Sequence, residues 1–430
     1  MRTFILVWLG QTMSLVGSQM THFALTIWIW QRTGEATSIS LLAFFIQVPI
    51  LVASIFVGIL VDRFNRKMLM MVGDAIAGFS TILILILLLT QHLDIWHLYL
   101  TGSISGLFGY VQALAFSASQ SLLISQQHYV RIGALGSIST FGSSVLAPSL
   151  AGVAYPLIGL SGILVIDVMT FVVAIGLLAI ASIPQPQLYK IQGQLPEISP
   201  GINISQIWQE LSFGFRYLLQ NPGLGALQLF AMGYIFFDNA ALLEPIILAR
   251  ADSNAVILGH VFAALGLGGL IGAIGLGIWG GPEHRIRGVL WGRAVIFSLE
   301  MLIGLGRTPV AWITAFFCAG LLKPTANSCE EAIWLAAVPP EMQGRVFSAN
   351  SFLIGILSSF GLLISGPLSD QVFEPAMRPG GILAPAFGPI FGTEIGSGMA
   401  LQFTLFSFVV VLICLGCYAV PVLRRVEEMP

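Results

Sequence analysis

The chain is dominated by long apolar stretches that are separated by short polar breaks. A helix needs about 20 mostly apolar residues to cross the hydrocarbon core of a bilayer. The sequence contains twelve such stretches, at 3–30, 37–61, 68–90, 98–123, 132–156, 161–184, 223–249, 256–279, 288–305, 309–337, 346–373 and 397–422. The pattern therefore predicts an all-α membrane protein with twelve transmembrane helices.

A polar segment divides these spans into two sets. Residues 183–205 are rich in Pro, Gln and Gly and interrupt the apolar pattern. The helical spacing of Ile207, Leu211 and Phe215 then predicts an amphipathic helix over 203–219 that lies on the inner leaflet. We expect an N-terminal six-helix bundle in 1–184, a cytoplasmic linker with this helix in 185–222, and a C-terminal six-helix bundle in 223–430.

An internal repeat relates the two sets of spans. With one offset of 219 residues, the stretch 139–142 recurs at 358–361, and Pro148 and Arg66 align with Pro367 and Arg285. Two repeats in the same membrane orientation imply a pseudo-two-fold axis along the membrane normal. In transporters built this way the substrate site lies near the midplane, between the halves.

Composition identifies lipid as the main solvent. The chain is 56% hydrophobic and only 9% charged, whereas soluble domains carry about 25% charged residues. Membrane lipids are therefore expected partners. The net charge of −2 and the lack of a basic run argue against nucleic acid. Catalytic signatures such as HExxH or a P-loop are absent from the sequence, so we predict no enzyme activity, no cofactor and no metal.

The basic residues orient the spans. If both termini are cytoplasmic, twelve of the 18 Lys and Arg residues fall in cytoplasmic segments, four in external loops and two within spans. This bias agrees with the positive-inside rule. The cytoplasmic set is Arg2, Arg63, Arg66, Lys67, Arg131, Lys190, Arg216, Arg285, Arg287, Arg345, Arg424 and Arg425.

The loop after the second span carries a charged motif, GILVDRFNRK at 58–67. A carboxylate at this membrane edge can face the positive N-terminus of another helix, and the basic residues lie at the negative end of the second span. The motif resembles the loop 2–3 signature of the major facilitator superfamily. The resemblance implies a cytoplasmic latch made of Gly58, Asp62, Arg63, Arg66 and Lys67. Anchoring by positive charge alone is the alternative interpretation.

A second motif lies in the fifth span, where Pro148 and Gly152 accompany Ala147 and Ala151. Small residues let helices approach closely, and proline bends a helix. The motif resembles a degenerate form of the antiporter signature of the same superfamily, which favours export over import. Generic helix packing explains the same residues equally well.

Several further stretches narrow the resemblance to one branch. They are WLGQ at 8–11, SLVGS at 14–18, Asp167 with Thr170, WGGPEHRI at 279–286, AIW at 332–334, QGRVF at 343–347, Gly366 with Asp370, and FEPAM at 373–377. They are similar to the macrolide-efflux-like branch of the drug:proton antiporters. The resemblance implies two six-helix bundles, a monomer in a bacterial cytoplasmic (inner) membrane, and proton-coupled export of drugs, macrolide-like compounds or siderophores.

Ionisable residues within spans are the candidate functional groups, because each costs several kcal/mol unless it is paired or hydrated, roughly 2.5–3.5 on insertion scales. Spans 1, 4, 7 and 10 line the cavity in this superfamily, and the repeat offset aligns Asp238 with Gln19 and Glu331 with Gln112. We therefore expect a substrate cavity that contains Gln19, Gln112, Asp238, Lys323 and Glu300. We expect Lys323 to pair with Asp238 or Glu244, and Asp167 to make a local packing hydrogen bond near Thr170.

Coupling to protons requires a carboxyl group that gains and loses a proton as access alternates. The candidates are Asp238, Glu244, Glu330 and Glu331, with Asp238 as the main carrier and Glu330 or Glu331 assisting. A static structural ion pair is the alternative for each of them. The alternative functions are an importer or facilitator on the same fold and, less favoured by the sequence, a polytopic membrane enzyme or a sensor without transport.

Overall fold

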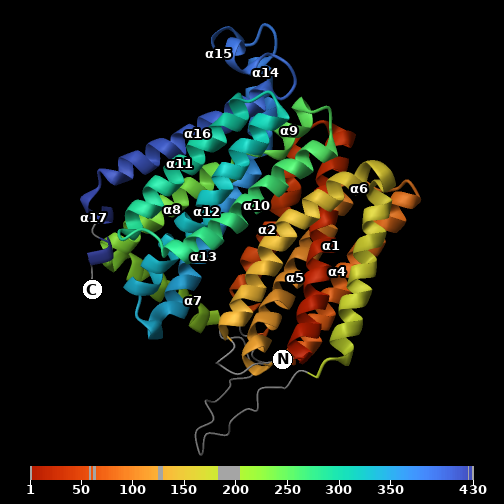
Figure 1. Cartoon of the computed structure of the whole chain (residues 1–430), viewed down its shortest axis with the longest axis vertical. Coiled ribbons are helices and arrows are strands. Elements are labelled where there is room, and N and C mark those ends of the chain that lie inside the picture. The colour runs from red at the N-terminus through yellow and green to blue at the C-terminus, as the bar shows by residue number, and fades with distance from the viewer. Residues whose placement is uncertain are drawn as a thin grey trace, which may run out of the picture.

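The computed structural model describes residues 2–57, 60–61, 64–123, 129–182, 204–424 and 426–428, and helices are the only regular secondary structure within these ranges. The N-terminal half contains α1 (Arg2–Thr33), α2 (Ala36–Ser54), α4 (Arg66–Leu89), α5 (Ile95–Leu123) and α6 (Tyr129–Ile180). The amphipathic α7 (Ile204–Gln220) follows. Figure 1 shows the two halves side by side.

The C-terminal half contains the remaining helices. They are α8 (Pro222–Asn239), α9 (Glu244–Arg250), α10 (Ala255–Trp279), α11 (Arg285–Leu305), α12 (Pro309–Ala337), α13 (Pro340–Leu368), the π-helix η2 (Ser369–Phe373), α14 (Glu374–Met377), α15 (Ala384–Phe391), α16 (Ser397–Tyr418), α17 (Pro421–Arg424) and the short η3 (Val426–Glu428). Local sequence explains several starts: the side chain of Asn254 caps α10, and that of Thr308 caps α12.

Twelve helices of the described chain are long enough to cross a bilayer. Nine apolar stretches qualify by length and composition. One of them, within α6, is two helices joined at Gly159, whose φ of +63° only glycine adopts readily. The more polar α1 and α5, with 32 and 29 residues, complete the set. The predicted twelve-helix membrane fold in two six-helix bundles is confirmed.

Span 7 differs from its prediction. The sequence suggested one helix over 223–249, but α8 ends at Asn239 and α9 begins at Glu244. Proline follows Glu244 directly and cannot supply a backbone N–H for the preceding turn. As a consequence, Asp238 and Glu244 lie on two separate helices rather than on one.

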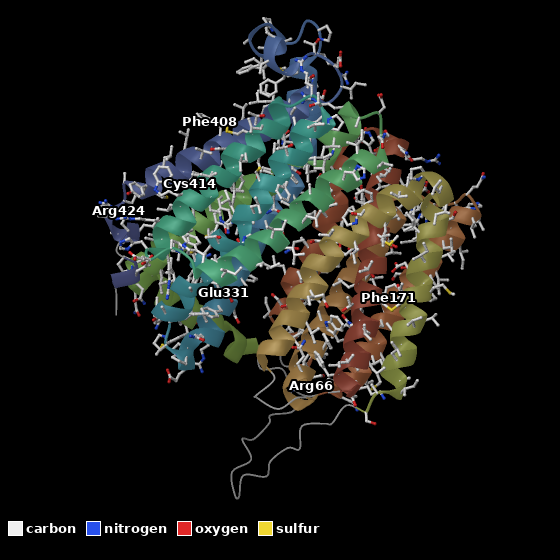
Figure 2. The ribbon with its side chains drawn as sticks, in the orientation of Figure 1. Arg66, Phe171, Glu331, Phe408, Cys414 and Arg424 are labelled. Carbon is white, nitrogen blue, oxygen red and sulfur yellow. The ribbon has the colours of Figure 1, made fainter. Side chains whose placement is uncertain are left out.

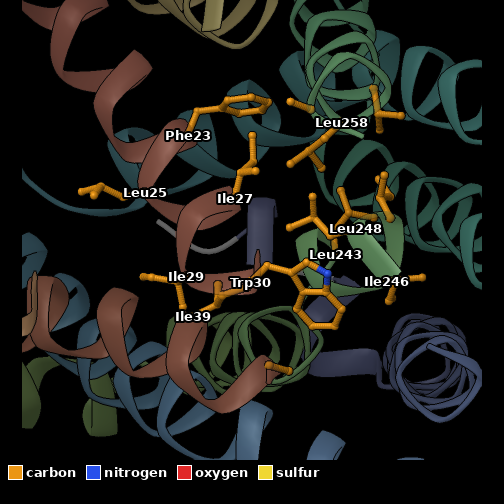
Figure 3. Packing of buried hydrophobic residues seen from close by; sticks show 14 of the residues in the cluster. Phe23, Leu25, Ile27, Ile29, Trp30, Ile39, Leu243, Ile246, Leu248 and Leu258 are labelled. Atoms are coloured by element: carbon orange, nitrogen blue, oxygen red, sulfur yellow. The ribbon is translucent and has the colours of Figure 1, made fainter. Parts of the chain in front are cut away.

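The helix bundle has two different ends. We call the end at which α1 begins the proximal end, and the opposite end, where α1 connects to α2, the distal end; Figure 1 shows the proximal end at the bottom and α14 and α15 at the top. The two halves share one apolar core toward the distal end. There Trp30 and Ile27 of α1 pack with Leu243, Ile246 and Leu258 of the other half (Figure 3).

The apolar cores nearer the proximal end do not cross between the halves. One contains only residues of the N-terminal half, such as Val7, Met70 and Ala115. The other contains only residues from Leu218 onward, such as Val289 and Trp334. Apolar packing therefore holds the halves together distally and leaves them as separate bodies proximally.

Close glycine contacts bring the halves together in several places, two of which bear on the motifs and on the closure. Gly152 of α6 and Gly259 of α10 face each other, and the backbone of Pro148 lies against Gly259. Gly355 of α13 lies against the side chain of Leu51 in α2. An added side chain at Gly259 would meet backbone atoms, so the small residues of the fifth-span motif serve close packing across the two halves.

The predicted amphipathic helix forms, but it lies against protein. It is α7, and its apolar side packs against α13, where Phe215 meets Phe352 edge to face. Gly214 lies close to the backbone of Arg345 and to Ala349. The prediction of the helix is therefore confirmed, while the expected inner-leaflet surface is at least partly a helix–helix contact with the C-terminal half.

Candidate functional site

A polar pocket lies inside the N-terminal half. It is enclosed by α1, α2, α4, α5 and α6, has a volume of about 370 Å³, and is lined by both predicted glutamines, Gln19 and Gln112. The side-chain amide of Gln112 donates to Gln11, whose own amide donates to Asp74 at 2.8 Å. The polar residues of α1 and α5 are thus explained by a pocket that they line.

Asp167 forms the second polar centre of this pocket. The sequence suggested a local bond near Thr170, but the Asp167 carboxylate accepts hydrogen bonds from Thr21 of α1 at 2.8 Å and Thr81 of α4 at 3.1 Å. Thr170 donates instead to the backbone carbonyl of Asp167. The carboxylate therefore joins three helices, and only 1% of the residue surface is exposed.

The C-terminal half holds an ion pair that corrects one prediction. Lys323 of α12 pairs with Glu300 of α11 at 3.0 Å, rather than with Asp238 or Glu244. The Glu300 side chain is 4% exposed and that of Lys323 is 33% exposed. Such a pair persists in a low-dielectric interior because each charge offsets the desolvation of the other.

A second ion pair lies on the same helices. Arg293 of α11 donates to Glu330 of α12 at 3.1 Å, and also to the Tyr234 hydroxyl and to Asn327. The Tyr234 hydroxyl donates to Glu330 at 3.2 Å, and the guanidinium lies 4.3 Å from the centre of the Tyr234 ring. This contact was not predicted from the sequence. The one available signal was that an arginine lies within one span and a glutamate within the next.

The other proton-coupling candidates occupy different surroundings. Asp238 is exposed in the last turn of α8, one helical turn beyond Tyr234. Glu331 is exposed on α12, and Figure 2 shows it nearer the proximal end of the C-terminal half. Glu244 begins α9, close to the shared apolar core. The predicted cavity residues therefore fall into two groups, with Gln19 and Gln112 in one half and Asp238, Lys323 and Glu300 in the other.

The latch motif is only partly within the described chain. Gly58, Asp62 and Arg63 lie outside the described residues. Arg66 donates to the carbonyl of Ala118 at 2.5 Å, and Lys67 donates to the carbonyls of Ala179 and Ala181 at 2.8 and 2.7 Å. These cations thus contact backbone carbonyls in the proximal, C-terminal turns of α5 and α6, toward the negative ends of the helix dipoles.

Asp370 joins the two halves at the distal end. Its carboxylate accepts hydrogen bonds from the backbone N–H groups of Ala36 and Thr37 at 3.1 and 2.7 Å, and from the Thr37 hydroxyl at 2.6 Å. Glu35, the residue before α2, makes no side-chain cap of its own. A carboxylate at a helix N-terminus is stabilised by unsatisfied N–H groups and by the helix dipole. Asp370 is recognisable in the sequence as a charged residue near the edge of a span, but nothing in the sequence indicates that it contacts the start of α2.

Metal binding has no support in the described part of the chain. Within those ranges, no group of three or more His, Cys, Asp or Glu side chains is arranged to hold a metal ion. Two carboxylates of the C-terminal half, those of Glu300 and Glu330, instead pair with Lys323 and Arg293.

Comparison with known proteins identifies the family. The sequence profile of the Major Facilitator Superfamily matches residues 7–362, which is most of the chain and includes both halves. The chain belongs to the Major Facilitator Superfamily. It is therefore a membrane transporter of small molecules and not an enzyme, and the superfamily predicted from the motifs is confirmed.

Curated members of the superfamily resemble the chain over most of its length. It is 26% identical to macrolide efflux protein A of Streptococcus pyogenes over 376 residues, which cover 86% of this chain and 90% of that protein. It is 23% identical to the enterobactin exporter EntS of Escherichia coli over 350 residues, covering 80% of this chain and 79% of that protein. Both relatives are named for efflux.

Solved superfamily structures share the fold. A bacterial homologue of the human lysosomal transporter Spinster, in an inward-facing conformation, has a TM-score of 0.69 at 15% identity and covers 99% of this chain and 97% of its own. An inward-facing bacterial homologue of the iron transporter ferroportin has a TM-score of 0.65 at 13% identity, covering 97% and 99%. At such identities the likeness shows the fold alone.

Proposed function

We propose that this transporter exports small amphipathic molecules across a bacterial inner membrane in exchange for protons, by alternating access between its two halves. One observation carries the proposal: the halves share an apolar core at the distal end and have separate cores at the proximal end. A molecule that closes at one end by apolar packing can open there only if the two bodies rotate against each other.

The direction of transport is proposed from the relatives. The curated proteins that resemble the chain over four-fifths of its length or more are named a macrolide efflux protein and an enterobactin exporter. The close contact between Gly152 and Gly259 across the halves lies where the antiporter-like motif of the fifth span was found. Amphipathic compounds such as drugs, macrolide-like molecules or siderophores are the proposed cargo.

The membrane orientation and the domain boundaries are part of the same proposal. With both termini cytoplasmic, the proximal end faces the cytoplasm, and the structure is closed toward the outside. The proposed division is a bundle in 1–184, a linker with α7 in 185–222, and a bundle in 223–430, which together act as a monomer. Apolar clusters that stay within each half nearer the proximal end support this division.

Asp238 is the proposed proton carrier among the four candidates. It is exposed, so water can deliver and remove a proton, and no described cationic side chain forms an ion pair with it. Glu330 is held by Arg293 and Tyr234 and can assist only when that contact loosens. Glu331 is exposed and can assist directly, whereas Glu244 lies beside the shared apolar core.

Transport into sealed vesicles tests this function. The full chain is reconstituted into proteoliposomes in both orientations. One orientation is silenced with a membrane-impermeant thiol reagent at a cysteine introduced by Met68→Cys, at an exposed position near the proximal end. A panel of amphipathic compounds is then followed under an imposed pH gradient. Export predicts solute movement from the proximal to the distal side, driven by protons moving the other way. Solute movement in the same direction as the protons identifies an importer and overturns the proposal.

A single substitution tests the proton carrier. Asp238→Asn is expected to abolish accumulation driven by the pH gradient while leaving exchange of labelled for unlabelled substrate in place. Glu283→Gln, at an exposed acidic residue in the loop before α11, is the matched control and is expected to keep accumulation. Proton-driven accumulation that survives Asp238→Asn unchanged contradicts the assignment.

A further inference from the structure

A second pocket, in the C-terminal half, contains polar atoms that nothing in the described protein satisfies. This pocket, which we call the proximal pocket, has a volume of about 330 Å³ and lies between α8, α11, α12 and α13. Its walls include Arg293, Glu331, Trp334, Phe347 and Asn350. It lies nearer the end at which the two halves have separate apolar cores.

Two buried atoms of this pocket lack hydrogen-bond partners. The Nε atom of Arg293 is a donor and the Oδ1 atom of Asn350 is an acceptor, and both are buried without a partner. The terminal nitrogen of Arg293 is already engaged by Tyr234, Asn327 and Glu330. Because buried polar groups in native proteins are normally hydrogen-bonded, this pair points to a ligand that carries both an acceptor and a donor.

The charge of the pocket is not balanced. Arg293 is neutralised by Glu330, whose carboxylate lies 3.1 Å away. Glu331 is exposed, and no described Lys, Arg or His side chain lies within ion-pair distance of its carboxylate. One uncompensated negative charge therefore remains at the pocket, and it attracts a cation and repels an anion.

An aromatic pair provides the apolar wall. The rings of Trp334 and Phe347 meet edge to face, with centroids 6.3 Å apart and planes at 89°. Such an arrangement offers a rigid apolar surface, and aromatic faces also stabilise nearby cations. A pocket of about 330 Å³ is at the lower end of small-molecule sites, so it fits a head group or a single ring system rather than a whole drug-sized molecule.

We propose that the proximal pocket binds the head group of the transported molecule, and that this head group is a protonated amine with a hydroxyl group close by, attached to an apolar ring. The protonated amine lies at the Glu331 carboxylate, and the ring packs on Trp334 and Phe347. The hydroxyl oxygen of the ligand accepts a hydrogen bond from Nε of Arg293. The hydroxyl hydrogen or an amine hydrogen is donated to Oδ1 of Asn350. The inference rests on the proposed transport function and names its substrate class.

Equilibrium binding to the purified full-length transporter in nanodiscs tests the site. The probe is propranolol, an aryl amino alcohol, and it is compared with an uncharged analogue in which an ether oxygen replaces the amine. Loss of one ion pair with a bound amine corresponds to roughly a tenfold change in affinity. We expect Glu331→Gln to weaken propranolol binding about tenfold and to leave the weak binding of the uncharged analogue unchanged.

Two controls separate the site from general effects. Glu341→Gln removes an exposed carboxylate at the start of α13, outside the pocket, and is expected to bind propranolol as the unmodified protein does. Asn350→Ala tests the unpaired acceptor and is expected to weaken propranolol binding more than binding of its deoxy analogue. Thermal unfolding of each variant confirms that the fold is intact.

The outcomes distinguish this inference from the proposed function. No binding of propranolol up to the millimolar range, or equal binding of the charged and uncharged probes, overturns the proposed head group. Equal effects of Glu331→Gln and Glu341→Gln overturn the site. If propranolol binding depends on the charge of Glu331 but propranolol is transported in the same direction as the protons, the site stands and proton-coupled export fails. If export holds without dependence on Glu331, the function stands and the site fails.

Discussion

The carboxylate of Asp370 accepts a hydrogen bond from the hydroxyl of Thr37 at 2.6 Å, although the two residues belong to opposite halves of the transporter. Two backbone N–H groups at the start of α2 donate to the same carboxylate. Gly366, four residues before Asp370 at the end of α13, lies against the backbone of Thr37, which brings α2 and the end of α13 close enough for this contact. The distal end is thus held by a directional polar contact as well as by apolar packing.

Loss of the Asp370 charge is expected to loosen the distal closure. A charged cap at a helix N-terminus contributes about 1–2 kcal/mol, so Asp370→Ala, which removes both the charge and the acceptor oxygens, should raise the population open at the distal end by roughly tenfold. The measurement uses a background in which the four native cysteines are replaced by serine. A cysteine is introduced by Leu243→Cys, at a buried position in the shared core, and the rate at which a membrane-impermeant maleimide labels it is recorded. Glu394→Gln, an exposed distal carboxylate, is the control, and equal labelling rates in the two variants contradict the prediction.

Removal of one member of the Lys323–Glu300 pair is expected to destabilise the fold. Breaking a buried ion pair costs about 3–5 kcal/mol, and the partial exposure of Lys323 reduces this to roughly 2–3 kcal/mol. Glu300→Gln should therefore lower the midpoint of thermal unfolding in detergent. The double variant Glu300→Gln with Lys323→Gln should recover part of the loss, because neither charge is then left alone. A double variant less stable than either single variant argues against the pair.

Steric pressure at Gly259 is expected to interfere with closure between α6 and α10. A side chain there meets the backbone of Pro148 and Gly152 in the other half. Overpacking of a few kcal/mol would destabilise only the conformation in which α6 and α10 are in contact. Gly259→Val should therefore lower the initial rate of transport by more than about tenfold. Gly275 of the same helix has open space around it, so Gly275→Val is the control and should transport nearly normally. Similar rates for both variants would show that this contact does not govern the cycle.

The apolar pattern alone was enough to predict most of the fold. Most of the predicted spans correspond to single helices because lipid imposes a length and a composition that the sequence displays directly. The exception with a functional consequence is span 7. The break after Asn239 hardly lowers the mean hydropathy of the stretch, and Pro245 is the only residue in the sequence that signals it. The fold of span 7 therefore separates two candidates, Asp238 and Glu244, that the sequence placed together.

The side-chain contacts of the candidate site were harder to predict from the sequence, because they depend on which faces of neighbouring helices are turned toward each other. The offset between the halves aligned Asp238 with Gln19, but it contains no information about which face of α11 meets α12. Consequently the partner of Lys323 was predicted wrongly, and the contact of Arg293 with Glu330 was not predicted. Asp370 and Thr37 are separated by more than 300 residues, and only packing of the two halves brings them together.

Opposite movement at the two ends of the transporter is the central claim, and pulsed electron paramagnetic resonance tests it most directly. One pair of spin labels is placed distally at Leu157 and Ile382 and another proximally at Met68 and Glu341, all of which are exposed. Each pair joins the N-terminal half to the C-terminal half. When pH is lowered in the presence of a transported compound, we expect the distal distance to lengthen and the proximal distance to shorten in the same fraction of molecules. Distances that stay fixed, or that change in the same direction at both ends, would contradict the account.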